Sequence, residues 1–85
     1  MITETDVTET LRRVRLVEVN AEPGDRQILE QRHGRIWDSR ELGQDFQVIG
    51  YLAPYVVVRR KADGVRGSLE FQHHQRFHFN WREDQ

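Results

Sequence analysis

The chain of 85 residues contains no cysteine. This absence excludes disulfide bonds, thiolate zinc sites and a cysteine nucleophile. Long hydrophobic runs are also missing, because the longest apolar stretch covers only residues 55–58, far short of the roughly 20 residues that a transmembrane helix needs. The polar residues that follow Met1 and Ile2 do not resemble a signal or transit peptide. We therefore expect a cytoplasmic protein that does not bind a membrane.

Lysine is almost absent, since Lys61 stands alone beside twelve arginines. Arginine grips phosphate and carboxylate groups through a planar fork of donors, although a GC-rich coding sequence produces the same bias. The formal net charge is only −1, with a net charge of −3 over residues 1–45 and of +2 over residues 46–85. A dedicated nucleic-acid-binding protein usually carries a stronger basic excess.

The composition is polar but typical of a folded chain. Hydrophobic residues make up 36% of the sequence and the mean hydropathy is −0.81, yet eight aromatic residues and a low net charge argue against disorder. We expect a flexible acidic N-terminal segment over residues 1–12, a single small domain over residues 13–82 and a charged tail over residues 83–85.

Local signals in the first half predict short elements. Residues 13–19 alternate and are rich in valine, which predicts a strand. A turn follows over residues 20–25, where proline and glycine stand together. Residues 25–33 predict a short helix, because Asp25 is a good N-cap and Gly34 stands where a left-handed C-terminal residue is favoured.

A stronger helix signal comes next. Asp38 and Glu41 have the spacing of a capping box, in which each side chain accepts a bond from the backbone of the other. Trp37 and Leu42 flank this pair with the spacing of a hydrophobic staple. Together they predict a short helix over residues 39–45.

The second half predicts four strands, over residues 46–52, 55–61, 66–72 and 76–81. Asp63-Gly64 is typical of a two-residue type I′ hairpin turn. Such a turn would place Val58 opposite Leu69, and Val56 opposite Phe71. The fold class that follows is α+β: an antiparallel β-meander of about four strands with one or two short helices packed on one face.

Alternation along these strands predicts one apolar face and one polar face. The apolar face would carry Val56, Val58, Leu69, Phe71, Phe77 and Phe79 and form the core under the helices. The polar face would gather basic and aromatic side chains, which are Tyr55, Arg59, Lys61, Arg66, Arg76, His78 and Arg82.

This polar face is the predicted partner-binding surface. A protein partner or self-association fits it best, and single-stranded RNA fits as an alternative, because bases stack on aromatic rings while arginine and lysine hold phosphates. The plain alternative is a solvated face whose arginine stems cover the sheet. We expect no small-molecule cofactor.

Histidines are the remaining candidates for chemistry. His73, His74 and His78 lie close in sequence, but on a strand positions four apart are ~13 Å apart, too far for two ligands of one zinc ion. We therefore expect no metal. The one enzyme that the residues allow is a metal-independent ribonuclease, with His78 as acid or base, Glu70 as its partner, and Arg59 or Arg76 holding the phosphate. Without a further catalytic motif, we predict a small binding or assembly module without catalysis.

Overall fold

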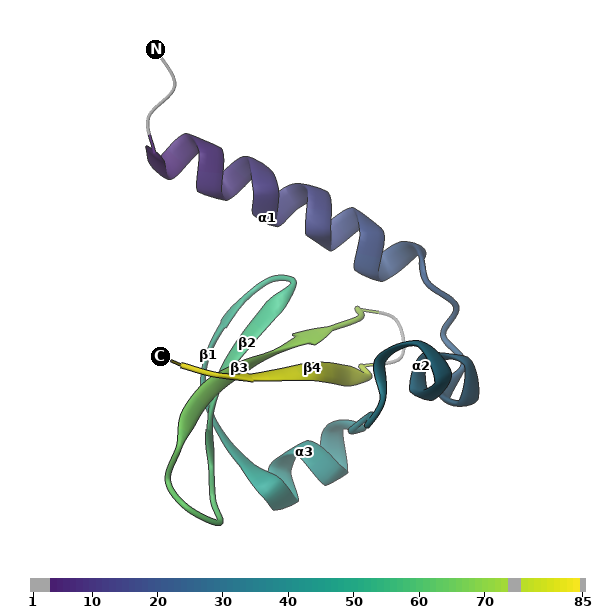
Figure 1. Cartoon of the computed structure of the whole chain (residues 1–85), viewed down its shortest axis with the longest axis vertical. Helices are drawn as coiled ribbons and strands as arrows, with labels where there is room; N and C mark the ends of the chain where they lie inside the picture. The colour runs from purple at the N-terminus through teal and green to yellow at the C-terminus, as the bar shows by residue number, and fades with distance from the viewer. Residues whose placement is uncertain (1–3, 74–75, 85) are drawn as a thin grey trace.

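The computed structural model describes residues 4–73 and 76–84. Three helices precede a four-stranded antiparallel sheet, so the predicted α+β class is confirmed (Figure 1). The helices are α1 (Glu4–Ala21), α2 (Arg26–His33) and α3 (Ser39–Asp45), and the strands are β1 (Phe46–Leu52), β2 (Tyr55–Arg60), β3 (Arg66–Phe71) and β4 (His78–Glu83). The strands lie in the order β1-β2-β3-β4, which is the predicted meander.

Helix α1 occupies the segment in which the sequence predicted a flexible tail and a strand. The strand predicted over residues 13–19 is wrong, because these residues form the second half of α1, and the domain boundary predicted after residue 12 falls inside the helix. Valine and threonine are weak helix formers, but tertiary contacts override that preference here. Arg12, Arg15 and Val19 are spaced by helical turns and carry contacts of α1 with the rest of the chain.

The two predicted helix caps are confirmed. Asp25 accepts a bond from the Ile28 backbone N–H at 3.2 Å. Glu41 N–H donates to Asp38 at 2.8 Å and Asp38 N–H donates to Glu41 at 3.1 Å, which completes the capping box of α3. Arg26 also binds both oxygens of Glu41 and so ties the start of α2 to the start of α3. Hydrogen bonds from Arg26 and from the Asp38 backbone lower the pKa of Glu41 to about 2.

The β2–β3 hairpin forms with a wider loop than predicted. Val56 lies opposite Leu69 rather than Phe71, a shift of two residues. Gly64 has the expected positive φ of 73°, whereas Asp63 does not, so the type I′ assignment is wrong. Asp63 instead accepts the N–H of Val65 at 3.1 Å, which stabilises a loop over residues 61–65. Because the shift is even, every side chain stays on its predicted face of β2 and β3.

Strand β4 shows a mixed outcome, since His78 and Phe79 lie on the faces opposite to those predicted, whereas Arg82 lies on its predicted face. Ser68 pairs with Arg82 while Glu70 pairs with Phe79, so β4 has one extra residue at this point. A bulge of this kind breaks the alternation of side chains along the strand, and Asn80 adopts a φ of 57° within it. His78, predicted to face outward, is therefore buried.

The sheet is covered on both sides, and we name its sides face A and face B. Face A carries Val56, Val58, Leu69 and Phe71, which form a core with Trp37, Leu42 and Phe46. Face B carries Phe79, which packs with Val19, Leu29 and Ile36. Figure 1 shows α1 on one side of the strands and α3 on the other. The sequence predicted helices on one face of the sheet, whereas the structure has helices on both faces.

Candidate binding site

Four of the seven predicted binding residues share face B. Arg59 lies directly opposite Arg66, and Arg82 lies opposite Ser68, two residues farther along β3. These three exposed arginines form what we call the arginine group, at the hairpin end of face B. Tyr55 is on the same face nearer α1 and is half-buried.

The other three predicted residues lie elsewhere. Lys61 is in the hairpin loop, and Arg76 is exposed ahead of β4 with a φ of 54°. His78 is 2% exposed and donates its backbone N–H and its Nδ1–H to the Trp37 carbonyl, at 2.8 and 3.0 Å. The prediction that His78 contributes to the polar surface is therefore wrong.

Helix α1 covers part of the surface that the sequence predicted to be open. Arg15 binds both carboxylate oxygens of Glu70, and Asn80 donates to the same group at 2.7 Å. Burial acts to raise the pKa of Glu70, but the bonds from Arg15 and Asn80 outweigh it and hold this pKa below its ordinary value. Gln72 donates to the Val19 carbonyl at 3.1 Å and anchors the end of the helix.

The residues proposed for a ribonuclease are not brought together. His78 points into face A, where burial lowers its pKa and keeps it neutral. Glu70 points to face B and is committed to Arg15. An acid–base pair must reach one substrate from one side, so this arrangement does not support the predicted catalytic set.

Metal-ligating side chains do not cluster within the described ranges, 4–73 and 76–84, where no group of three or more histidine, aspartate or glutamate residues could hold an ion. His74 lies outside the described residues, and so does the predicted separation of His74 from His78.

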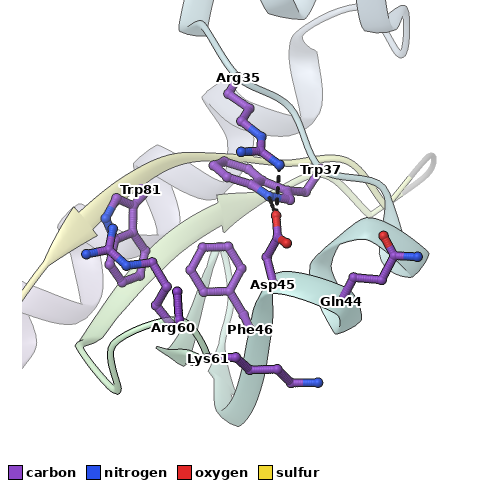
Figure 2. Close-up of a pocket in the computed structure, with 9 residues that line it drawn as sticks. Arg35, Trp37, Gln44, Asp45, Phe46, Arg60, Lys61 and Trp81 are labelled. Carbon is purple, nitrogen blue, oxygen red and sulfur yellow. Dashed lines mark hydrogen bonds and ion pairs between the residues drawn. The ribbon is translucent and has the colours of Figure 1, made fainter.

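The structure contains a pocket of about 680 Å³ (Figure 2). It lies between the α3–β1 junction, the β2–β3 loop and β4. Nine residues line it, namely Arg35, Trp37, Gln44, Asp45, Phe46, Arg60, Lys61, Ala62 and Trp81. Of the seven predicted binding residues, Lys61 alone is among them.

Three aromatic rings form the apolar wall of this pocket. The Phe46 ring lies 5.4 Å from Trp37 and 5.0 Å from Trp81, measured between centroids. Trp81 takes its place because Gly67 leaves room for it: a Cβ at this position would lie 2.5 Å from the Trp81 ring and 2.3 Å from the Arg82 carbonyl oxygen. The small residue on β3 thus positions the indole on β4.

Cations form the rim. The Arg35 guanidinium lies 4.6 Å above the Trp37 ring, and Asp45 binds both residues, accepting from Arg35 at 2.8 Å and from the Trp37 indole at 2.9 Å. Arg60 lies 5.2 Å above Trp81. Cation–π contacts of this kind hold a guanidinium against a ring while its N–H groups face solvent.

The two rim arginines have acidic partners, whereas the lysine is held by a carbonyl. Arg60 binds Asp63 in the adjacent loop, with its shortest contact at 2.6 Å. Lys61 donates to the Gly43 carbonyl at 2.7 Å, and no described carboxylate lies within 4 Å of it. The charged lining residues are Arg35, Asp45, Arg60 and Lys61, so the pocket has a net charge of +2.

Sequence reasoning missed this pocket because its walls come from distant segments. Trp37 was assigned to a helix staple, which is consistent with burial but does not indicate a pocket shared with another segment. The available signal was that the chain has only two tryptophans and that Arg35 lies two residues before one of them.

Comparisons of the chain with models of protein families, with curated proteins and with solved structures found no match. In the part of the chain that the structure describes, no helix is both long enough and apolar enough to cross a membrane. Function is therefore inferred from the residues of the chain itself.

Proposed function

We propose that this chain is a small non-catalytic binding module and that an acidic segment of a protein partner docks in the pocket between Trp37 and Trp81. The observation that carries the proposal is the pocket itself, which combines an aromatic wall with three cations on the rim. We also propose that the module works in the cytoplasm and needs no cofactor.

Each part of the pocket matches one part of such a ligand. The partly exposed Trp81 ring offers apolar area to one side chain of the partner, which is how interface anchors gain most of their binding energy. Lys61 has donors to spare, because the structure records a single bond from its ammonium group. A carboxylate beside the anchor would take charge-assisted bonds from that group, and from Arg60 if it exchanged Asp63 for the ligand.

The same geometry favours a protein partner over RNA. Single-stranded RNA needs open ring faces on which its bases stack. Trp37 is 7% exposed and Phe46 is 3% exposed, and guanidinium groups lie over both indoles. The net charge of −1 also gives little general attraction for a polyanion.

Binding assays with short peptides test the proposal. The probes are peptides that carry one aromatic or aliphatic side chain between glutamates, and an oligouridylate serves as the RNA probe. Lys61→Glu should weaken peptide binding by about tenfold or more, since it reverses a charge on the rim. The matched control is Arg59→Glu, which makes the same type of charge reversal two positions away, in the arginine group on face B.

Each outcome has one meaning. Loss of peptide binding in Lys61→Glu alone supports the pocket as the binding site. Loss with Arg59→Glu alone would move the site to the arginine group, and equal loss with both would indicate unspecific charge attraction, so either result overturns the pocket. If the chain binds the oligouridylate but none of the peptides, the ligand is RNA and not a protein segment.

A further inference from the structure

Another pocket lies on face B, where α1 meets β2, β3 and β4, and its volume is about 390 Å³. We call it the polar pocket, because six polar side chains line it, namely Arg15, Tyr55, Ser68, Glu70, Asn80 and Arg82. It shares none of its charged residues with the pocket between Trp37 and Trp81. Binding at the two pockets can therefore be tested separately.

The acid that lines the polar pocket already has partners, whereas one of its two arginines does not. Arg15 binds both carboxylate oxygens of Glu70, and Asn80 donates to the same carboxylate at 2.7 Å. Arg82 is exposed and makes no ion pair with a carboxylate in the part of the chain that the structure describes. The charged lining residues therefore leave a net charge of +1, and that charge belongs to Arg82.

Two hydroxyl-bearing side chains line the pocket beside these charged groups. Ser68 pairs with Arg82 across β3 and β4, and Tyr55 pairs with Glu70 across β2 and β3. Neither hydroxyl has a hydrogen-bond partner among residues 4–73 and 76–84. A guanidinium donates two parallel N–H bonds to an oxyanion, and each hydroxyl can donate one more. This set of donors suits a compact oxyanion such as a phosphoryl group.

We propose that the polar pocket binds a small phosphate monoester, whose phosphoryl group takes bonds from Arg82, Ser68 and Tyr55. The other two members of the arginine group strengthen the attraction. Arg59 and Arg66 are exposed on the same face and lie opposite each other at the hairpin end. Their potential favours a phosphoryl group over a carboxylate, because a phosphate monoester carries close to two negative charges at neutral pH.

The size and the walls of the pocket favour an ester over free phosphate. A water molecule takes up about 30 Å³ of liquid, so a pocket of about 390 Å³ has room for an organic group beside the phosphoryl group. Tyr55 and Trp81 line the pocket and are partly exposed. Their rings offer apolar area to that organic group.

Nuclear magnetic resonance titrations of the full chain test the inference. The probes are phenyl phosphate and inorganic phosphate, with chloride replacing phosphate so that the ionic strength stays constant. Phenyl phosphate should bind with a Kd of about 1 mM or lower and shift the backbone amides of Tyr55, Ser68 and residues 80–82. Arg82→Gln should weaken this binding by about tenfold or more, because it removes the paired N–H donors.

Two further variants make the test specific. Ser68→Ala removes one donor without changing the charge and should weaken binding by about threefold to tenfold. The matched control is Arg59→Gln, which removes the same charge from the same face but outside the lining, and its affinity should stay within about threefold of the wild type. Circular dichroism checks that each variant is folded.

The outcomes separate the ligand from its charge. Tighter binding of phenyl phosphate than of inorganic phosphate supports the ester, whereas the reverse order would overturn it in favour of free phosphate. Equal weakening by Arg82→Gln and Arg59→Gln would indicate general attraction by positive charge and would overturn the site. So would the absence of saturable shifts at up to about 30 mM of either probe.

Discussion

The two faces of the sheet are stabilised in different ways. On face A, seven buried apolar residues from the strands, from α3 and from Trp37 form one cluster. On face B, the buried apolar cluster has four members, and polar bonds join α1 to the strands beside it. Arg15 binds Glu70 and Gln72 binds the Val19 carbonyl, each across more than 50 residues of sequence.

This difference shows how a small chain covers both faces of a sheet when it has too few apolar residues for two complete cores. Face A follows from side-chain alternation, so hydrophobic burial alone can order it. Face B depends on charged and amide groups that gain stability only when their distant partners are in place. We therefore expect α1 and α2 to loosen before the sheet does.

The largest expected effect comes from emptying the centre of the face B cluster. Phe79→Ala removes a side chain with no exposed surface and should lower the free energy of unfolding by about 3–5 kcal/mol. Hydrogen exchange should accelerate in α1 and α2 more than in β2 and β3. Leu42→Ala on face A is the control, and in this variant the amide hydrogens of α1 should remain protected from exchange. Uniform acceleration in both variants would show that the two faces unfold together.

The next effect tests the polar link between α1 and the sheet. Arg15→Met leaves the carboxylate of Glu70, whose side chain is 11% exposed, without its cation, and should cost about 1–3 kcal/mol, reduced because Arg15 itself is 31% exposed. Adding Glu70→Gln should recover part of this loss in urea melts. Arg13→Met, which breaks an exposed pair with Glu9, should cost less than about 0.5 kcal/mol. Equal costs at both arginines would mean that the buried link has no special role.

The smallest expected effect is a dependence on pH that belongs to face A. Burial lowers the pKa of His78 below that of an unfolded histidine, so the unfolded chain binds the proton more readily. The contribution of neutral His78 to the free energy of unfolding is fully present above about pH 7. It is lost as the pH falls below about 6.5, by at most about 1.4 kcal/mol per pH unit. His78→Phe keeps a ring and removes this slope. Denaturant melts at several pH values check it, and identical slopes in both proteins would contradict the buried neutral histidine.

Local signals allowed much of the fold to be predicted. The capping box at Asp38 and the faces of β2 and β3 depend on neighbours in sequence or on period two, and both were confirmed. The prediction failed for His78 and Phe79 in β4 because a single bulge at Asn80 breaks the alternation, and no residue type indicates that position. The prediction for α1 failed because arginines make two of its contacts with the sheet, and a search for apolar periodicity does not include arginine.

The candidate site could be predicted less well. Lys61 was predicted on the polar sheet face, whereas the structure places it in the hairpin loop at the pocket rim. Trp37 was interpreted as part of a helix staple, and the pocket that it shares with Phe46 and Trp81 exists only because Gly67 leaves room for one indole and Asp45 bonds to the other. Contacts of this kind join segments tens of residues apart, so they cannot be inferred from spacing.

Both tryptophans of the chain line the pocket. The intrinsic fluorescence of this protein therefore comes from that one place. The Trp37 indole is buried and bonded to a carboxylate, whereas Trp81 is partly exposed beneath a guanidinium. The two should emit at different wavelengths, and a soluble quencher should reach one of them first. A ligand that entered the pocket would change this signal without any attached label, so the protein carries its own optical reporter at the site where binding is proposed.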